Sequence, residues 1–138
     1  EGQKEIWHLV TFDPPYVFNA ETYGNDDRDL CHIKDLDAFN AKLEECLINL
    51  KRLIKTSSFS KKEFHPIVIK LGSGRRGELG LVDMATEVEV IGRKLGLVLH
   101  DKVINILDSQ WAMFNVSRCI ENRYSVKNHE TNLVFVKY

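Results

Sequence analysis

Hydrophobic residues in this chain alternate between strand-like and helix-like spacing. Four short apolar runs predict β-strands, and two segments whose apolar residues recur every three to four positions predict helices. The predicted strands span 6–12, 66–71, 97–107 and 133–138, and the predicted helices span 36–54 and 81–95. We expect the first strand, Ile6 to Phe12, to be buried. This order predicts an α/β fold with a mainly parallel sheet and flanking helices. Because no helix precedes the last strand, we expect it to pair antiparallel with the strand before it.

The first helix has the clearer signals. Asp35 is a suitable N-cap, and basic residues occupy the last turn, where the helix dipole favours cations. Its expected inner face comprises Leu36, Phe39, Leu43, Cys46, Leu47, Leu50, Leu53 and Ile54. The second helix is expected to bury Leu81, Met84, Ala85, Val88, Ile91 and Leu95.

Composition indicates one domain, residues 1–138, because the chain has 138 residues and is 43% hydrophobic.

No apolar run approaches the roughly 20 residues that cross a bilayer, and the start lacks a signal-peptide pattern. A net charge of −1 predicts no overall attraction to nucleic acid, so any such contact must come from local basic patches. The three cysteines lack metal-ligand spacing, which favours reduced thiols in a cytoplasmic protein and no metal site.

The sequence Asp13-Pro14-Pro15-Tyr16 directly follows the first predicted strand. Ligands of open parallel sheets bind beyond the carboxyl ends of strands. There the Asp13 carboxylate and the Pro14 carbonyl are suited to accept both hydrogens of an amino group, while Tyr16 offers a face for a base. The alternative is an ordinary turn, since Asp and Pro both favour turns.

This motif resembles the catalytic motif of DNA amino-methyltransferases. The likeness continues through the polar segment 13–34 and the following helix, and residues 129–137 resemble a closing strand that often reads His-Glu-x-x-Leu-Val-Phe. The resemblance implies a Rossmann-like sheet, S-adenosyl-L-methionine as cofactor and DNA as partner. It implies methyl transfer to adenine N6 or cytosine N4, of the restriction–modification type. The flipped base would stack on Tyr16, enclosed by Phe18 and Tyr23.

One departure from that family is large. A complete domain of this type has about seven strands and a Gly-rich cofactor turn, whereas four strands are predicted here. The chain therefore resembles the catalytic half of such a domain, completed by another polypeptide segment or a homodimer. Two alternatives stay open: a guanine-N2 methyltransferase acting on RNA, and a non-catalytic remnant that serves as an interaction domain.

The segment Gly72-Ser73-Gly74-Arg75-Arg76-Gly77 follows a predicted strand and precedes a predicted helix. With Asp101 further along, it matches a dinucleotide-binding pattern, which makes Gly72, Gly74 and Gly77 candidates for cofactor binding. The alternative is an exposed loop in which Arg75 and Arg76 contact DNA phosphates.

A second basic cluster contains Lys51, Arg52, Lys55, Lys61 and Lys62. It is interpreted either as a set of phosphate contacts or as a solvated helix end and turn. His129 and Glu130 suggest an acid–base pair, but adjacent strand residues point to opposite faces, which favours a simple strand start.

Overall fold

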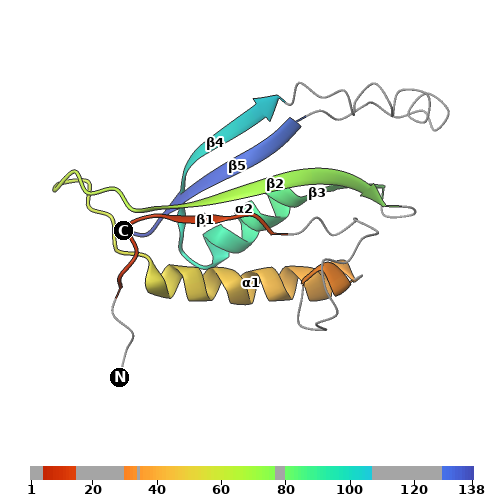
Figure 1. Ribbon diagram of the computed structural model, residues 1–138, viewed down its shortest axis with the longest axis horizontal. Coiled ribbons are helices and arrows are strands. Elements are labelled where there is room, and N and C mark those ends of the chain that lie inside the picture. The colour runs from red at the N-terminus through yellow and green to blue at the C-terminus, as the bar shows by residue number, and fades with distance from the viewer. Residues whose placement is uncertain (1–4, 15–29, 34, 77–79, 107–128) are drawn as a thin grey trace.

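The computed structural model describes residues 5–14, 30–33, 35–76, 80–106 and 129–138. Figure 1 shows the arrangement of its elements. In chain order they are β1 (Val10–Phe12), a short 3-10 helix (Leu30–His32), α1 (Leu36–Leu53), β2 (Pro66–Arg76), β3 (Gly80–Asp83), α2 (Met84–Lys94), β4 (Val98–Ile106) and β5 (His129–Val136). No helix among these residues is long and apolar enough to cross a membrane.

The main sheet has the strand order β1-β2-β5-β4. β1 and β2 are parallel, with Val10 opposite Ile67, and β5 is antiparallel to both of its neighbours. It follows that β1, β2 and β4 run in one direction, whereas β5 and the short β3, which pairs antiparallel with β2 outside this order, run in the other. The α/β sheet of mainly parallel strands is confirmed, as is the antiparallel pairing of the last strand with its predecessor. That strand begins at His129, earlier than the expected residue 133.

Both helices pack against one face of this sheet. Alternate residues of β2 and β5, including Ile69 and Phe135, form a single core with residues of α1 and α2. Fully buried side chains include Phe39, Leu43 and Leu47 of α1 and Val88 of α2. Figure 1 shows α1 running alongside β1 and β2. Residues at the intervening strand positions consequently lie on the opposite face, which we call the open face.

The helix starts follow from their caps. The Asp35 side chain accepts a hydrogen bond from the Ala38 backbone N–H at 2.8 Å, which confirms the expected N-cap of α1. The Asp83 side chain caps α2 in the same way, accepting from Ala85 at 3.3 Å. α2 therefore begins at Met84 rather than at the expected residue 81.

Gly72 and Gly74 of the glycine-rich segment belong to a strand and not to a loop. β2 continues through Gly72 and Gly74 to Arg76, and it pairs antiparallel with β3, placing Arg76 opposite Gly80. Leu81, expected on the helix, belongs to β3. The prediction fails because a hairpin can use backbone hydrogen bonds that the side-chain pattern does not reveal.

The first strand is shorter and more exposed than expected. Only Val10–Phe12 pair with β2, and Trp7 makes an isolated bridge to Ile54 at the end of α1. Ile6, Trp7 and Leu9 were expected to be buried but are 56%, 51% and 53% exposed. The reason is topological, because among the described residues β1 has a strand partner on one side only.

Candidate functional site

Asp13 and Pro14 lie at the carboxyl end of β1, as the sequence predicts. Neither residue is part of a turn or bend, and Pro14 is buried. The Asp13 side chain is 59% exposed, so its carboxylate is open to solvent and to a substrate. The other proposed members of this site, Pro15, Tyr16, Phe18 and Tyr23, lie outside the described residues.

The structure adds two residues to this site. Lys70 Nζ lies 3.8 Å from Asp13 Oδ2 and 3.2 Å from Glu130 Oε2. Because Phe12 is paired with Ile69, the next position along each strand brings Asp13 beside Lys70. The three side chains form a row across β1, β2 and β5 on the open face, which we call the Asp13–Lys70–Glu130 row.

The electrostatics of the row centre on Lys70. A hydrogen bond to the Glu130 carboxylate raises the pKa of Lys70, and the negative charges of Glu130 and Asp13 raise it further. The ammonium is therefore charged at neutral pH. The Glu130 side chain is only 15% exposed, and Lys70 Nζ stands between its carboxylate and that of Asp13.

Sequence reasoning missed Lys70 although one signal was present. Lys70 is the only charged residue in the apolar run of residues 66–71, and it stands next to the glycine-rich segment. Glu130 was noticed, and its interpretation as a residue at the start of a strand agrees with its place in β5. What could not be seen was that β5 lies directly beside β2.

The setting of Gly72 and Gly74 does not favour the dinucleotide-binding interpretation. Gly72 and Gly74 belong to a paired strand, so they form no phosphate-binding loop in front of a helix. Gly77 lies outside the described residues. Asp101 in β4 accepts a hydrogen bond from the Lys102 backbone at 2.8 Å, a local contact within its own strand.

Arg75 and Arg76 end β2 in the hairpin with β3, where they pair with Leu81 and Gly80. Their backbone lies at the carboxyl end of β2, further along the strand than Lys70. Contact of these two arginines with DNA phosphate stays a prediction.

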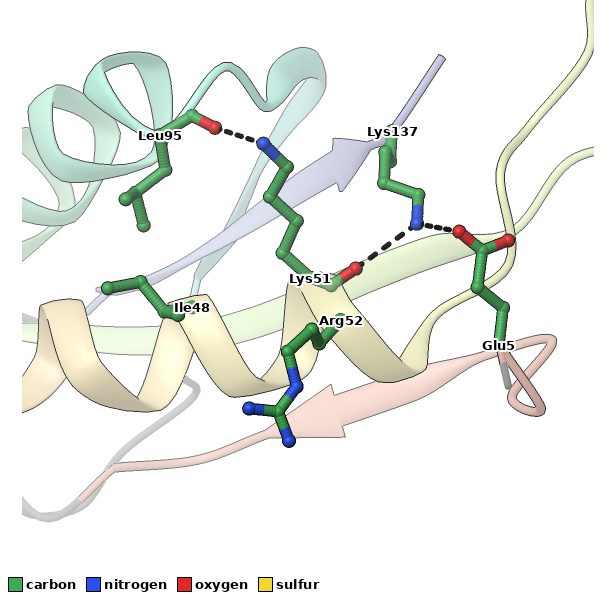
Figure 2. A pocket seen from close by; sticks show the side chains of 6 residues that line it. All are labelled: Glu5, Ile48, Lys51, Arg52, Leu95 and Lys137. Atoms are coloured by element: carbon green, nitrogen blue, oxygen red, sulfur yellow. Dashed lines mark hydrogen bonds and ion pairs between the residues drawn. The ribbon is translucent and has the colours of Figure 1, made fainter. Parts of the chain in front are cut away.

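Part of the second basic cluster lines a cavity of about 470 Å³ at the opposite end of the sheet. Its lining residues are Glu5, Ile48, Lys51, Arg52, Leu95 and Lys137 (Figure 2). Lys51 Nζ donates to the Leu95 carbonyl at the end of α2, and Lys137 Nζ pairs with Glu5 and donates to the Lys51 carbonyl at 3.3 Å. These contacts favour the interpretation as a helix end, since the ammonium groups satisfy carbonyls where both helices finish.

The described residues offer few other reactive groups. Among the described residues, no group of three His, Cys, Asp or Glu side chains could hold a metal ion. Cys46 is a free thiol on α1, and burial raises its pKa, which disfavours the reactive thiolate. The row at the end of β1 is therefore the strongest candidate site within the described part of the chain.

Among the comparisons with known proteins, those with solved structures give matches, and these agree on the fold. No family model and no curated protein matches the chain. Among solved structures, TTHA0409 from Thermus thermophilus, provisionally assigned as a DNA modification methylase, has 22% identity and a TM-score of 0.65, covering 96% of this chain and 45% of that one. The same protein complexed with S-adenosyl-L-methionine has a TM-score of 0.59. The cytosine-N4-specific PvuII DNA methyltransferase has 13% identity and a TM-score of 0.56, covering 97% of this chain and 43% of that one.

These matches confirm the resemblance seen in the sequence at the level of fold. Almost the whole chain superposes on methyltransferase structures, yet it spans less than half of their length. The chain thus has the fold of one part of a DNA methyltransferase.

Proposed function

We propose that this chain is the catalytic half of an S-adenosyl-L-methionine-dependent DNA methyltransferase. The acceptor is the exocyclic amino group of a base, adenine N6 or cytosine N4, in an enzyme of the restriction–modification type. The similarity to PvuII DNA methyltransferase and to TTHA0409 in complex with S-adenosyl-L-methionine supports the reaction class and the cofactor.

The observation that carries this proposal is the position of Asp13 and Pro14. They stand at the carboxyl end of a strand in an open sheet, the usual place for ligands in such folds. The Asp13 carboxylate is accessible and lies 3.8 Å from Lys70 Nζ.

The role of these residues is to prepare the amine. Its lone pair is delocalised into the base, which makes the nitrogen a poor nucleophile. Hydrogen bonds from the two N–H groups to the Asp13 carboxylate and the Pro14 carbonyl concentrate that pair on nitrogen and orient it. After the nitrogen has gained a methyl group, it loses one proton to Asp13 or to water. Flipping the base out of the duplex allows Tyr16 to stack on it.

The described residues do not fit the cofactor itself. S-adenosyl-L-methionine supplies an electrophilic methyl group when it is bound, but the glycine-rich segment that might have held it is a paired strand. Within the described residues the chain provides amine activation. Cofactor binding is therefore assigned to the part of the enzyme that this chain does not match.

The test uses the complete parent protein and methyl-labelled cofactor. Asp13→Ala should lower methyl transfer to DNA by at least about 10²-fold, the usual contribution of a positioned acid or base. Asp37→Ala, which removes an exposed carboxylate from α1, is the matched control and should leave the rate unchanged. Mass spectrometry of the product then identifies N6-methyladenine or N4-methylcytosine. Equal rates for Asp13→Ala and the wild type would rule out the assigned role.

Two further outcomes distinguish the alternatives. Methylation of guanine in RNA, with none in DNA, would establish the RNA methyltransferase. No methylation of either polymer, together with no calorimetric heat on addition of S-adenosyl-L-methionine, would identify a non-catalytic remnant. The remnant is favoured by one observation, namely that the chain covers only 43–47% of the length of the matched methyltransferases.

A further inference from the structure

We propose that Lys70 is a positioning residue for the methyl transfer: its ammonium holds one oxygen of the Asp13 carboxylate, so that the other oxygen accepts from the amino group of the base. The inference rests on the proposed function, because it assigns Lys70 a task in that reaction. It adds a residue that lies on a different strand from the Asp13-Pro14-Pro15-Tyr16 motif. Lys70 does not touch the base in this scheme and acts only through Asp13.

The contact between Lys70 and Asp13 involves one carboxylate oxygen. Lys70 Nζ lies 3.8 Å from Asp13 Oδ2, a distance at which opposite charges attract each other without a direct hydrogen bond. Both side chains are substantially exposed, so packing restricts their rotamers only in part. A neighbouring cation favours those rotamers of a carboxylate that bring an oxygen toward it. The second oxygen, Oδ1, is thereby assigned to the N–H group of the amine.

Lys70 can hold Asp13 because Lys70 is itself held. Its ammonium pairs with Oε2 of the largely buried Glu130 at 3.2 Å. Glu130 lies opposite Gly72 in the pairing of β2 with β5, two positions beyond Lys70 on the same face of the sheet. Glycine brings no side chain to this face, so the long Lys70 side chain reaches the carboxylate on the diagonal. The anchor thus comes from β5 and the carboxylate to be positioned from β1, with Lys70 on β2 between them.

The charges of the Asp13–Lys70–Glu130 row suit the reaction as well as its geometry does. Two carboxylates and one ammonium leave one net negative charge on the open face. The amine nitrogen gains positive charge as it takes the methyl group, and a fixed negative charge nearby favours that transition state. Lys70 alone would oppose this step, and Glu130 offsets its charge. Loss of Lys70 therefore separates two effects, because lost positioning slows the transfer whereas a lost positive charge speeds it.

The test measures single-turnover methyl transfer by the complete parent protein at saturating DNA and saturating methyl-labelled cofactor. Under these conditions the rate reports the transfer and not the binding of DNA. Lys70→Met should lower this rate about 10- to 100-fold, because a displacement of about 1 Å in a reacting group can cost up to about 100-fold. The affinity for DNA should stay unchanged. Lys70→Arg keeps a cation at this position and should restore most of the lost rate.

Lys102→Met is the matched control. Lys102 is 38% exposed and pairs with Glu89 of α2 at 3.6 Å, so this variant also takes a strand lysine away from a carboxylate. Lys102 lies opposite the core residue Leu133 and is therefore on the helix-covered face, away from the row. Its rate should equal that of the wild type. Circular dichroism verifies that every variant is folded at the assay temperature.

A double variant shows whether Lys70 acts through Asp13. In an Asp13→Ala background, the further change Lys70→Met should leave the residual rate unchanged, because the carboxylate that Lys70 holds is gone. A second loss of the same size in this background would overturn the proposal. So would a rate of Lys70→Met that equals or exceeds the wild-type rate, or a Lys70→Arg variant as slow as Lys70→Met.

The positioning role and the proposed function fail at different points of this experiment. An inactive wild type, or a wild-type rate for Asp13→Ala, would refute the proposed function and this inference with it. A wild type that is active, loses its rate with Asp13→Ala and keeps it with Lys70→Met would refute the positioning role alone.

Discussion

Replacing Lys70 by methionine tests the Asp13–Lys70–Glu130 row most directly. The change removes the ammonium and keeps a side chain of similar length. The contact to Asp13 is long, at 3.8 Å, and both side chains are substantially exposed, so it contributes at most about 1 kcal/mol. The contact to Glu130 is shorter, at 3.2 Å, and the Glu130 side chain is only 15% exposed. Losing a hydrogen bond between charged groups of this kind costs about 1–3 kcal/mol.

We therefore expect Lys70→Met to destabilise the fold by about 1–3 kcal/mol. For a chain of this size each kcal/mol corresponds to a melting temperature lower by about 2–8 °C, which circular dichroism resolves. Glu130→Gln removes the charge from the other partner and keeps its shape. In the double variant the two losses should be less than additive by about 1 kcal/mol, because the same contact is removed twice.

The pH dependence gives an independent measurement. The pKa of Lys70 is raised in the folded state, so its contribution to stability is fully present below the pKa of an unfolded lysine, about 10.4. That contribution is lost as the pH rises through the higher folded value. The stability difference between the wild type and Lys70→Met should then narrow in alkaline solution. Unchanged stability of Lys70→Met at neutral pH, with strictly additive losses in the double variant, would refute this account of the row.

Two other substitutions test the packing and the chain ends. A Cβ at Gly92 would lie 2.6 Å from the Phe135 ring. Gly92→Ala should therefore lower the free energy of unfolding by about 1–3 kcal/mol. An unchanged free energy in urea unfolding would contradict the described packing of α2 on β5. The hydrogen bond from Lys137 lowers the pKa of Glu5 in the folded state. The stabilisation by this pair is therefore fully present above the pKa of an unfolded glutamate, about 4.3. It is lost as the pH falls through the lower pKa of the folded state. Glu5→Gln should remove this loss of stability at acidic pH from a plot of melting temperature against pH. Identical plots for the variant and the wild type would count against a stabilising role of the pair.

The sequence predicted those elements whose signals are local. The apolar repeat and Asp35 defined α1 almost to the residue, because both the helix period and the cap act within a few positions. The extension of β2 through Gly72 and Gly74 could not be predicted in this way. Its stability comes from pairing with β3, and glycine and arginine carry no strand pattern of their own. Burial of the first strand was overestimated for a related reason, since an apolar run does not reveal how many neighbours a strand has.

The candidate site shows the same limit more sharply. Asp13 and Pro14 were found because a motif next to a strand end is a local signal. Lys70 joins them only because β1 pairs with β2, and Glu130 only because β5 inserts between β2 and β4. The apolar pattern of β5 then determines which face of the sheet each of its side chains occupies. A slip of β5 by one residue would move Leu133 and Phe135 out of the core and turn Glu130 away from Lys70. The same alternation that buries the core therefore holds Glu130 on the open face, where it anchors the cation beside Asp13.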